Sequence, residues 1–151
     1  MVRATSEISD EAPEVQYTED LFVYAVDFPL LAANGSVDAN IQIEADSYFK
    51  WIKGTYFAYV DGTDPESTSA TRPIPPVTIQ ITDSGSGRQL FNIPIFVSTI
   101  FGVGELPMIN PLPRIFKPRS NISFSAQNLS AADDWRISLQ LIGVKGFKGR
   151  G

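Results

Sequence analysis

The chain contains neither cysteine nor histidine among its 151 residues. Without cysteine it can form no disulfide framework, no thiolate nucleophile and no cysteine-ligated metal site. Without histidine it has no Ser-His-Asp triad, no histidine-ligated zinc and no side chain whose ordinary pKa lies near neutrality. These two absences exclude most hydrolase mechanisms, and we therefore expect no enzymatic activity, no metal and no cofactor.

Long apolar runs are also missing. No run approaches the roughly 18 residues that a membrane-spanning helix needs. The polar and acidic segment 1–20 shows no apolar stretch of the signal-peptide kind. We therefore expect no membrane partner and no export by that route.

The charged residues are unevenly distributed. Residues 1–70 hold 13 acidic and 3 basic residues, whereas residues 71–151 hold 4 acidic and 9 basic residues, and the net charge is −5. An acidic chain lacks the basic footprint that phosphate binding needs, so we expect no nucleic-acid partner. The two oppositely charged halves suit contacts with copies of the chain or with a charged scaffold. Alternatively, the acidic residues only solubilise a flexible arm.

The sequence is rich in short runs of β-branched and aromatic residues with a period of two, separated by turns of glycine, proline, serine and aspartate. This pattern predicts an all-β antiparallel sandwich or jelly roll with about eight strands. We expect a flexible acidic arm over residues 1–20, because it holds too few apolar residues to pack alone. The β-sandwich domain is expected over residues 21–147, with a short tail over 148–151.

The expected strands are separated by two long loops. Residues 61–76 form one loop, and residues 98–113 carry two glycines and three prolines, so we expect an ordered loop there instead of a strand. Residues 114–128 supply one or two strands, broken at Pro118. The other expected strands are 21–28, 39–46, 55–61, 77–83, 88–97 and 133–147.

Within residues 41–61, two acids, Glu44 and Asp46, precede a group of aromatic residues. Carboxylates two residues apart on one strand have Cα atoms roughly 6.5–7 Å apart, a separation that glycosidases use. Both point from one strand, however, whereas catalytic carboxylates flank the bond from opposite sides. We therefore predict that the acids face solvent or a neighbouring subunit, and that the aromatic residues hold the sheets together. The aromatic residues are Tyr48, Phe49, Trp51, Tyr56, Phe57 and Tyr59.

Two segments are candidates for contacts with a partner. The apolar residues of the loop 98–113 suit burial against another molecule, or they fold back on their own sandwich. The segment 114–119 alternates bases with apolar residues and could pair with acids of an adjacent copy. The candidate interface residues are Ile100, Phe101, Leu106, Met108, Arg114, Phe116, Lys117, Arg119, Glu44 and Asp46.

The segments "IQIEADSYFKWIKG", "PPVTIQITDSGSGRQLFNIPI", "STIFGVGELP", "LPRIFKP" and "WRISLQLIGVKGF" follow one another in this order. This succession resembles small virion proteins of tailed bacteriophages, above all head-decoration or cement proteins. The resemblance covers roughly Leu21–Phe147 and lies in texture and segment order, with no invariant chemical motif.

The resemblance implies a homo-oligomer, a dimer or a trimer, on the exterior of the phage head. Such a protein binds the major capsid protein, stabilises contacts between its subunits and is present in the host cytoplasm during assembly. One alternative is a carbohydrate-binding β-sandwich of a head fibre or receptor-binding protein, which would need an exposed planar row of Trp and Tyr. The other alternative is a tail or neck component of the same particle.

Overall fold

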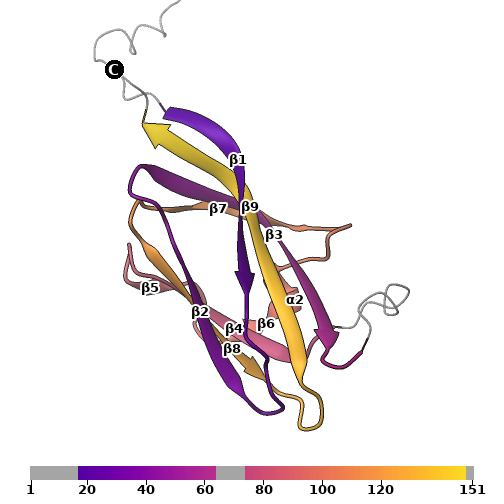
Figure 1. The fold of residues 1–151 in the computed structure, drawn as a ribbon. Coiled ribbons are helices and arrows are strands. Elements are labelled where there is room, and N and C mark those ends of the chain that lie inside the picture. The colour runs from indigo at the N-terminus through magenta and orange to yellow at the C-terminus, as the bar shows by residue number, and fades with distance from the viewer. Residues whose placement is uncertain (1–16, 64–73, 149–151) are drawn as a thin grey trace, which may run out of the picture.

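The computed structural model describes residues 17–63 and 74–148, and it consists of two antiparallel sheets packed against each other (Figure 1). The predicted all-β sandwich is confirmed. The elements are β1 (Tyr17–Asp27), β2 (Ser36–Gln42), β3 (Ser47–Val60), β4 (Val77–Asp83), β5 (Arg88–Gln89), β6 (Ile95–Phe96), α2 (Val97–Ile100), β7 (Met108–Phe116), β8 (Asn121–Asn128) and β9 (Trp135–Lys148).

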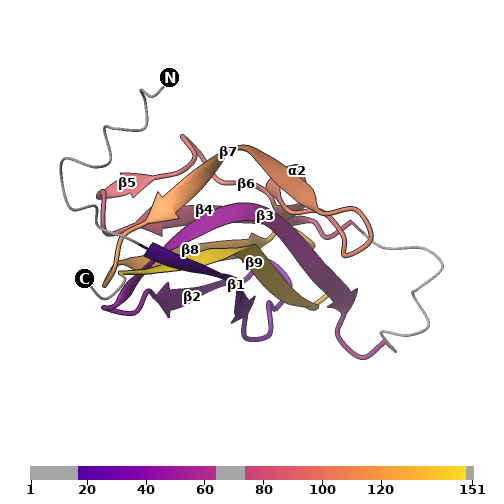
Figure 2. The same ribbon diagram turned by 90° about the horizontal axis from the view of Figure 1, so that it is seen from above.

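Sheet A has the strand order β1-β9-β3-β7, and sheet B has the order β2-β8-β4-β5 with β6 also paired to β4. Figure 1 shows the long strand β9 running between β1 and β3. Seen from above, β5, β6 and β7 lie along one side of the molecule (Figure 2). The edge strand β7 of sheet A is therefore the neighbour of the short edge strands of sheet B.

The period-two alternation places the apolar set of each strand in the core, because successive side chains of a strand point to opposite faces. In β8 the side chains of Ile122, Phe124 and Ala126 are buried, as the alternation predicts. In β9 the predicted inward set is buried as well. It comprises Trp135, Ile137, Leu139 and Leu141.

The predicted role of the aromatic group is confirmed for three of its members. Phe49, Trp51 and Tyr56 are buried, and Trp51 stacks on Phe101 with 5.5 Å between ring centroids. Phe57 points away from the core and is 43% exposed. The group thus divides between the two faces of β3.

Several boundaries differ from the predictions, and the predicted strand 55–61 is the end of a longer strand, β3, which begins at Ser47. Strand β1 begins at Tyr17, four residues before the predicted start of the domain, because residues 17–20 pair with residues 145–148 of β9. The rest of the predicted arm, residues 1–16, lies outside the described residues, as do residues 149–151 of the predicted tail. Strand β2 ends at Gln42, so Glu44 and Asp46 follow the strand and do not lie within it.

The largest difference from the predictions concerns residues 98–113, which were expected to form a loop. This segment contains the last residues of the helical turn α2 and, from Met108, the first residues of β7. Pro111 and Pro113 lie within β7 between Ile109 and Arg114, where the pairing with β3 is irregular, and prolines are tolerated in such bulges and on edge strands. Conversely, the expected strand 88–97 is reduced to the two-residue strands β5 and β6.

Candidate partner interface

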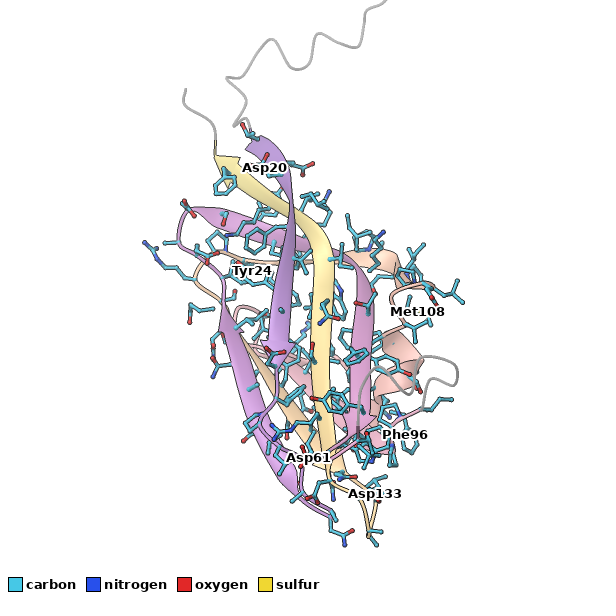
Figure 3. All side chains as sticks on the ribbon, turned by 45° about the vertical axis from the view of Figure 1, so that its right-hand side comes forward. Asp20, Tyr24, Asp61, Phe96, Met108 and Asp133 are labelled. Atoms are coloured by element: carbon cyan, nitrogen blue, oxygen red, sulfur yellow. The ribbon has the colours of Figure 1, made fainter. Side chains whose placement is uncertain are left out.

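A group of exposed apolar side chains surrounds the start and middle of β7. Leu106 is 76% exposed, Leu112 is 83% exposed, and Met108 (labelled in Figure 3) and Ile74 are exposed as well. Single exposed apolar side chains are normal, but a cluster of this kind marks an interaction site. We call Ile74, Leu106, Met108 and Leu112 the apolar edge.

Two hollows flank β7 at the apolar edge. The larger, of about 480 Å³, is lined by Ile74, Leu106 and Met108 together with Phe101 and Val103. The smaller, of about 190 Å³, lies beside Leu112 and is also lined by Leu90, Phe91 and Ile100. Concave apolar surface next to protruding apolar side chains is the relief that a well-packed interface uses.

The loop before β7 is attached to the sandwich through Phe101. This side chain is fully buried, and a Cβ at position 54 would lie 2.6 Å from its ring, so Gly54 provides the space that the ring occupies. The backbone is attached to β3 as well, since Tyr56 N–H donates to the Gly102 carbonyl (2.7 Å). Phe101 thus follows the alternative in which the loop folds back on its own sandwich, whereas the side chains of Leu106 and Met108 remain exposed.

The basic segment 114–119 likewise contains both buried and exposed side chains. Phe116 is fully buried, and Arg114 is half-buried with its guanidinium 3.9 Å from the buried carboxylate of Asp83 on sheet B. The inclusion of Phe101 and Phe116 among the interface residues is therefore corrected, because their side chains are fully buried within the chain itself. Ile100 is half-buried.

Lys117 and Arg119 are exposed, and neither forms an ion pair with another described residue. Arg119 has a positive φ of 70°, and its N–H donates to the Ile43 carbonyl (3.0 Å), so the backbone is held while the side chain is left free. These two bases remain available to a partner.

Glu44 is held by the chain itself, although its side chain is about half exposed. One carboxylate oxygen accepts hydrogen bonds from the Tyr24 hydroxyl and from the Lys145 ammonium, both at 2.6 Å. Lys145 is buried and lies 4.1 Å from the centroid of the Phe22 ring. This arrangement, near Tyr24 in Figure 3, connects the turn after β2 to sheet A.

The electrostatics of this cluster follow from these contacts. The hydrogen bonds from Lys145 and then from Tyr24 lower the pKa of Glu44, so its carboxylate stays ionised. Burial, together with the hydrogen bond to Glu44, raises the pKa of Tyr24 above its usual range. An ionised carboxylate fixed by a lysine and a protonated phenol is suited to holding the fold, and Asp46 is exposed in the adjoining turn.

Sequence reasoning missed Leu112 and Ile74 of the apolar edge. The prolines of "NPLP" favour a loop, although prolines two apart point to one side of a strand and are compatible with a strand at a sheet edge. Asn110 supports this arrangement from within, since its side-chain amide donates to the Trp51 carbonyl (3.0 Å). Ile74 lies in a segment with no periodicity that could have placed it.

Other kinds of site find little support among residues 17–63 and 74–148. Both tryptophans are buried, and the Phe57 and Tyr59 rings are tilted by 53°, so the aromatic residues form no planar row for a sugar. In the same residues there is no group of three acids that could hold a metal ion, and no helix long and apolar enough to cross a membrane. Comparison with known proteins identifies no relative, since no family model, no curated protein and no solved structure matches this chain.

Proposed function

We propose that this protein is a non-enzymatic structural component of a tailed-phage particle, a decoration or cement protein that binds the outer surface of the head. There it would stabilise contacts between subunits of the major capsid protein. The observation that carries the proposal is the apolar edge, whose exposed side chains and adjoining hollows fit burial against another protein. The resemblance in segment order supports the choice of particle.

The apolar edge favours attachment by side chains over attachment by strand addition. An edge strand normally exposes a row of backbone N–H and C=O groups that another strand can extend. In β7, however, Pro111 and Pro113 have no N–H, so a continuous ladder with a further strand cannot form there. The partner is therefore expected to present a surface with apolar side chains that fill the hollows beside β7.

The two free bases, Lys117 and Arg119, suit the rim of such a contact. Rim charges mainly steer association and select the partner, and they contribute little affinity individually. An acidic surface beside the apolar patch of the partner is the complement. Because Arg114 is paired with Asp83, charge reversal should be confined to Lys117 and Arg119, which can be changed without disturbing the fold.

The test measures binding to heads isolated from particles assembled without this protein. The double variant Leu106→Glu, Leu112→Glu places two charges in the apolar edge, and we expect its apparent Kd in co-sedimentation to rise about tenfold or more. Leu129→Glu, at a half-exposed position beyond the end of β8, is the matched control and should bind normally.

Circular dichroism should show the same β spectrum for all three proteins, since the altered side chains are exposed. Equal binding by wild type and double variant would contradict the role of the apolar edge. Binding of the wild type to isolated tails but not to heads would contradict decoration of the head and support the tail or neck alternative.

A further inference from the structure

A second apolar surface covers the outer face of sheet A, which Figure 3 shows with β1, β9 and β3 side by side. On this face Leu21 is 76% exposed, Ile109 64%, Ile115 55% and Val23 43%. The outer face of a solvated antiparallel sheet is ordinarily polar. This face therefore has the composition of a contact surface, and along β7 its residues Ile109 and Ile115 alternate with those of the apolar edge.

The pairing registers arrange these side chains in rows across the four strands. One row runs from Leu21 on β1 through Val144 and Lys50 to Ile115 on β7. The next row is Val23, Ile142, Lys53 and Ile109. Each row thus has apolar residues at both ends and a lysine from β3 between them.

The two ends of the first row have complementary shapes. At the β7 end a groove of about 450 Å³ lies beside Ile115, with Tyr48, Lys117 and Pro118 among its walls. At the β1 end stands Leu21, with most of its side chain in solvent. One protruding leucine therefore lies at one end of the row, and a groove that extends from Ile115 to Tyr48 and Gly146 of the adjacent row begins at its other end.

The charges of the face are divided between the same two sides. Glu19 and Asp27 lie on β1, whereas Lys50 and Lys53 lie on β3, and the groove itself is lined by one acid, Asp46, and one base, Lys117. Glu19 already contacts Lys50 at 3.7 Å within the chain. The face as a whole nevertheless has an acidic side and a basic side, so two copies can be complementary only in particular orientations.

We infer that this face binds a second copy of the chain, as a dimer about a two-fold axis parallel to the strands of sheet A. Such an axis places β1 of one copy over β7 of the other and β9 over β3, in the aligned packing that twisted sheets adopt. Each Leu21 then lies over the partner's groove beside Ile115. The acidic side of each copy faces the basic side of the other.

The orthogonal two-fold axis is disfavoured by the same observations. An axis perpendicular to the strands would place β1 over β1, with acids against acids and groove against groove. Like charges placed opposite each other across an interface oppose association. Shape and charge therefore select the strand-parallel axis.

Cross-linking between single-cysteine variants tests this arrangement directly, because the natural chain contains no cysteine. Leu21→Cys and Ile115→Cys are prepared separately with different tags, mixed, and treated with a bismaleimide that spans about the 10 Å between packed sheets. We expect the heterodimer to form in the mixture, and each variant alone to cross-link about tenfold less or weaker still. Equally efficient cross-linking of Leu21→Cys alone would place β1 over β1 and overturn the proposed axis.

Sedimentation equilibrium then separates this face from the apolar edge. Leu21→Glu should raise the dimer dissociation constant about tenfold or more, while Leu112→Glu should leave it unchanged. A wild-type protein that stays monomeric at high micromolar concentration would overturn the dimer. Dimerisation is independent of head binding, so a dimer that binds no heads would contradict the proposed function alone.

Discussion

The outer faces of the two sheets differ sharply, although both inner faces contribute to one core. The outer face of sheet B carries uncharged polar residues on β2, β8 and β4, with Asp38 as its acid. These residues are Ser36, Asn40, Gln42, Ser123, Ser125, Gln127, Thr78, Gln80 and Thr82. The outer face of sheet A presents leucine, valine and isoleucine in the two rows that end at Ile115 and Ile109, beside charged and polar residues.

This difference shows that alternation and composition carry separate information. The two-residue alternation determines which side chains point away from the core, and the strands of both sheets follow it. The kind of residue in the outward set indicates what that face suits, which is water for sheet B and, in the inferred dimer, a second copy for sheet A. Four predictions test this comparison, and they run from the largest effect to the smallest.

The largest effect is expected where sheet A is most tightly built. A Cβ at position 143 of β9 would collide with the Lys50 carbonyl on β3, a backbone atom that cannot move aside. We expect Gly143→Ala to lower the free energy of unfolding by about 3 kcal/mol. Gly104→Ala is the control, because its Cβ would meet no atom within 4 Å. Urea unfolding followed by circular dichroism measures both, and equal midpoints would refute the packing described at Gly143.

On sheet B, the polar outer face is expected to contain one residue that the fold needs. Gln80 is buried, donates to the Phe91 carbonyl (2.9 Å) and accepts from the Ile81 N–H (3.1 Å). Gln80→Ala should cost about 1–3 kcal/mol of unfolding free energy, because buried backbone groups lose their partners. Its cross-strand neighbour Ser125 is exposed, so Ser125→Ala should change little. If Gln80→Ala changed the free energy of unfolding as little as Ser125→Ala does, the hydrogen bonds of Gln80 would not contribute to stability.

The third prediction concerns the link between the sheets at Glu44. Its pKa is lowered in the folded state, so its contribution is present above the ordinary value of 4.5 and disappears as the pH falls through the lowered pKa. Because the side chain is half exposed, we expect a contribution of about 1 kcal/mol. Glu44→Gln should therefore cost this amount near neutral pH and progressively less in acid.

Asp46→Asn, two residues further along the same turn, is the control for the pH series. Thermal unfolding of wild type and both variants from about pH 7 down to about pH 3 measures the effect. A constant difference between wild type and Glu44→Gln across that range would contradict an ionic link to Lys145.

The smallest effect on stability is expected from exchanging the character of the outer faces. Val23→Thr and Ser125→Val alter exposed side chains, and each should change the free energy of unfolding by less than about 0.5 kcal/mol. Sedimentation should nevertheless separate them, since Val23→Thr weakens the inferred dimer and Ser125→Val leaves it intact. If both variants associate like the wild type, the apolar composition of sheet A has no role in association.

Much of the fold could be predicted because strand patterning is local. Ile122, Phe124 and Ala126 alternate with serine and asparagine over a few residues, and their burial follows from the pleat alone. β7 could not be predicted in the same way. Its prolines are compatible with a strand only at a sheet edge or a bulge, and both depend on the strand order and on the register with β3.

The candidate interface was predicted in part for a related reason. Leu106 and Lys117 are exposed as expected. In contrast, Phe101 stacks on Trp51 and Arg114 lies near Asp83, and both of these partners are distant in sequence. Composition identifies a residue that needs a partner. It does not state whether that partner lies in the same chain.

By itself, the sequence determined the all-β class, the alternating core and the lack of histidine and cysteine chemistry, since each depends on residue type or on nearest neighbours. The tertiary structure alone decided that Lys145 is buried over Phe22 and bound to Glu44, and that Leu21 shares a row with Ile115. These relations depend on the register between strands far apart in the chain. A shift of one residue in that register would exchange the inner and outer faces of a strand.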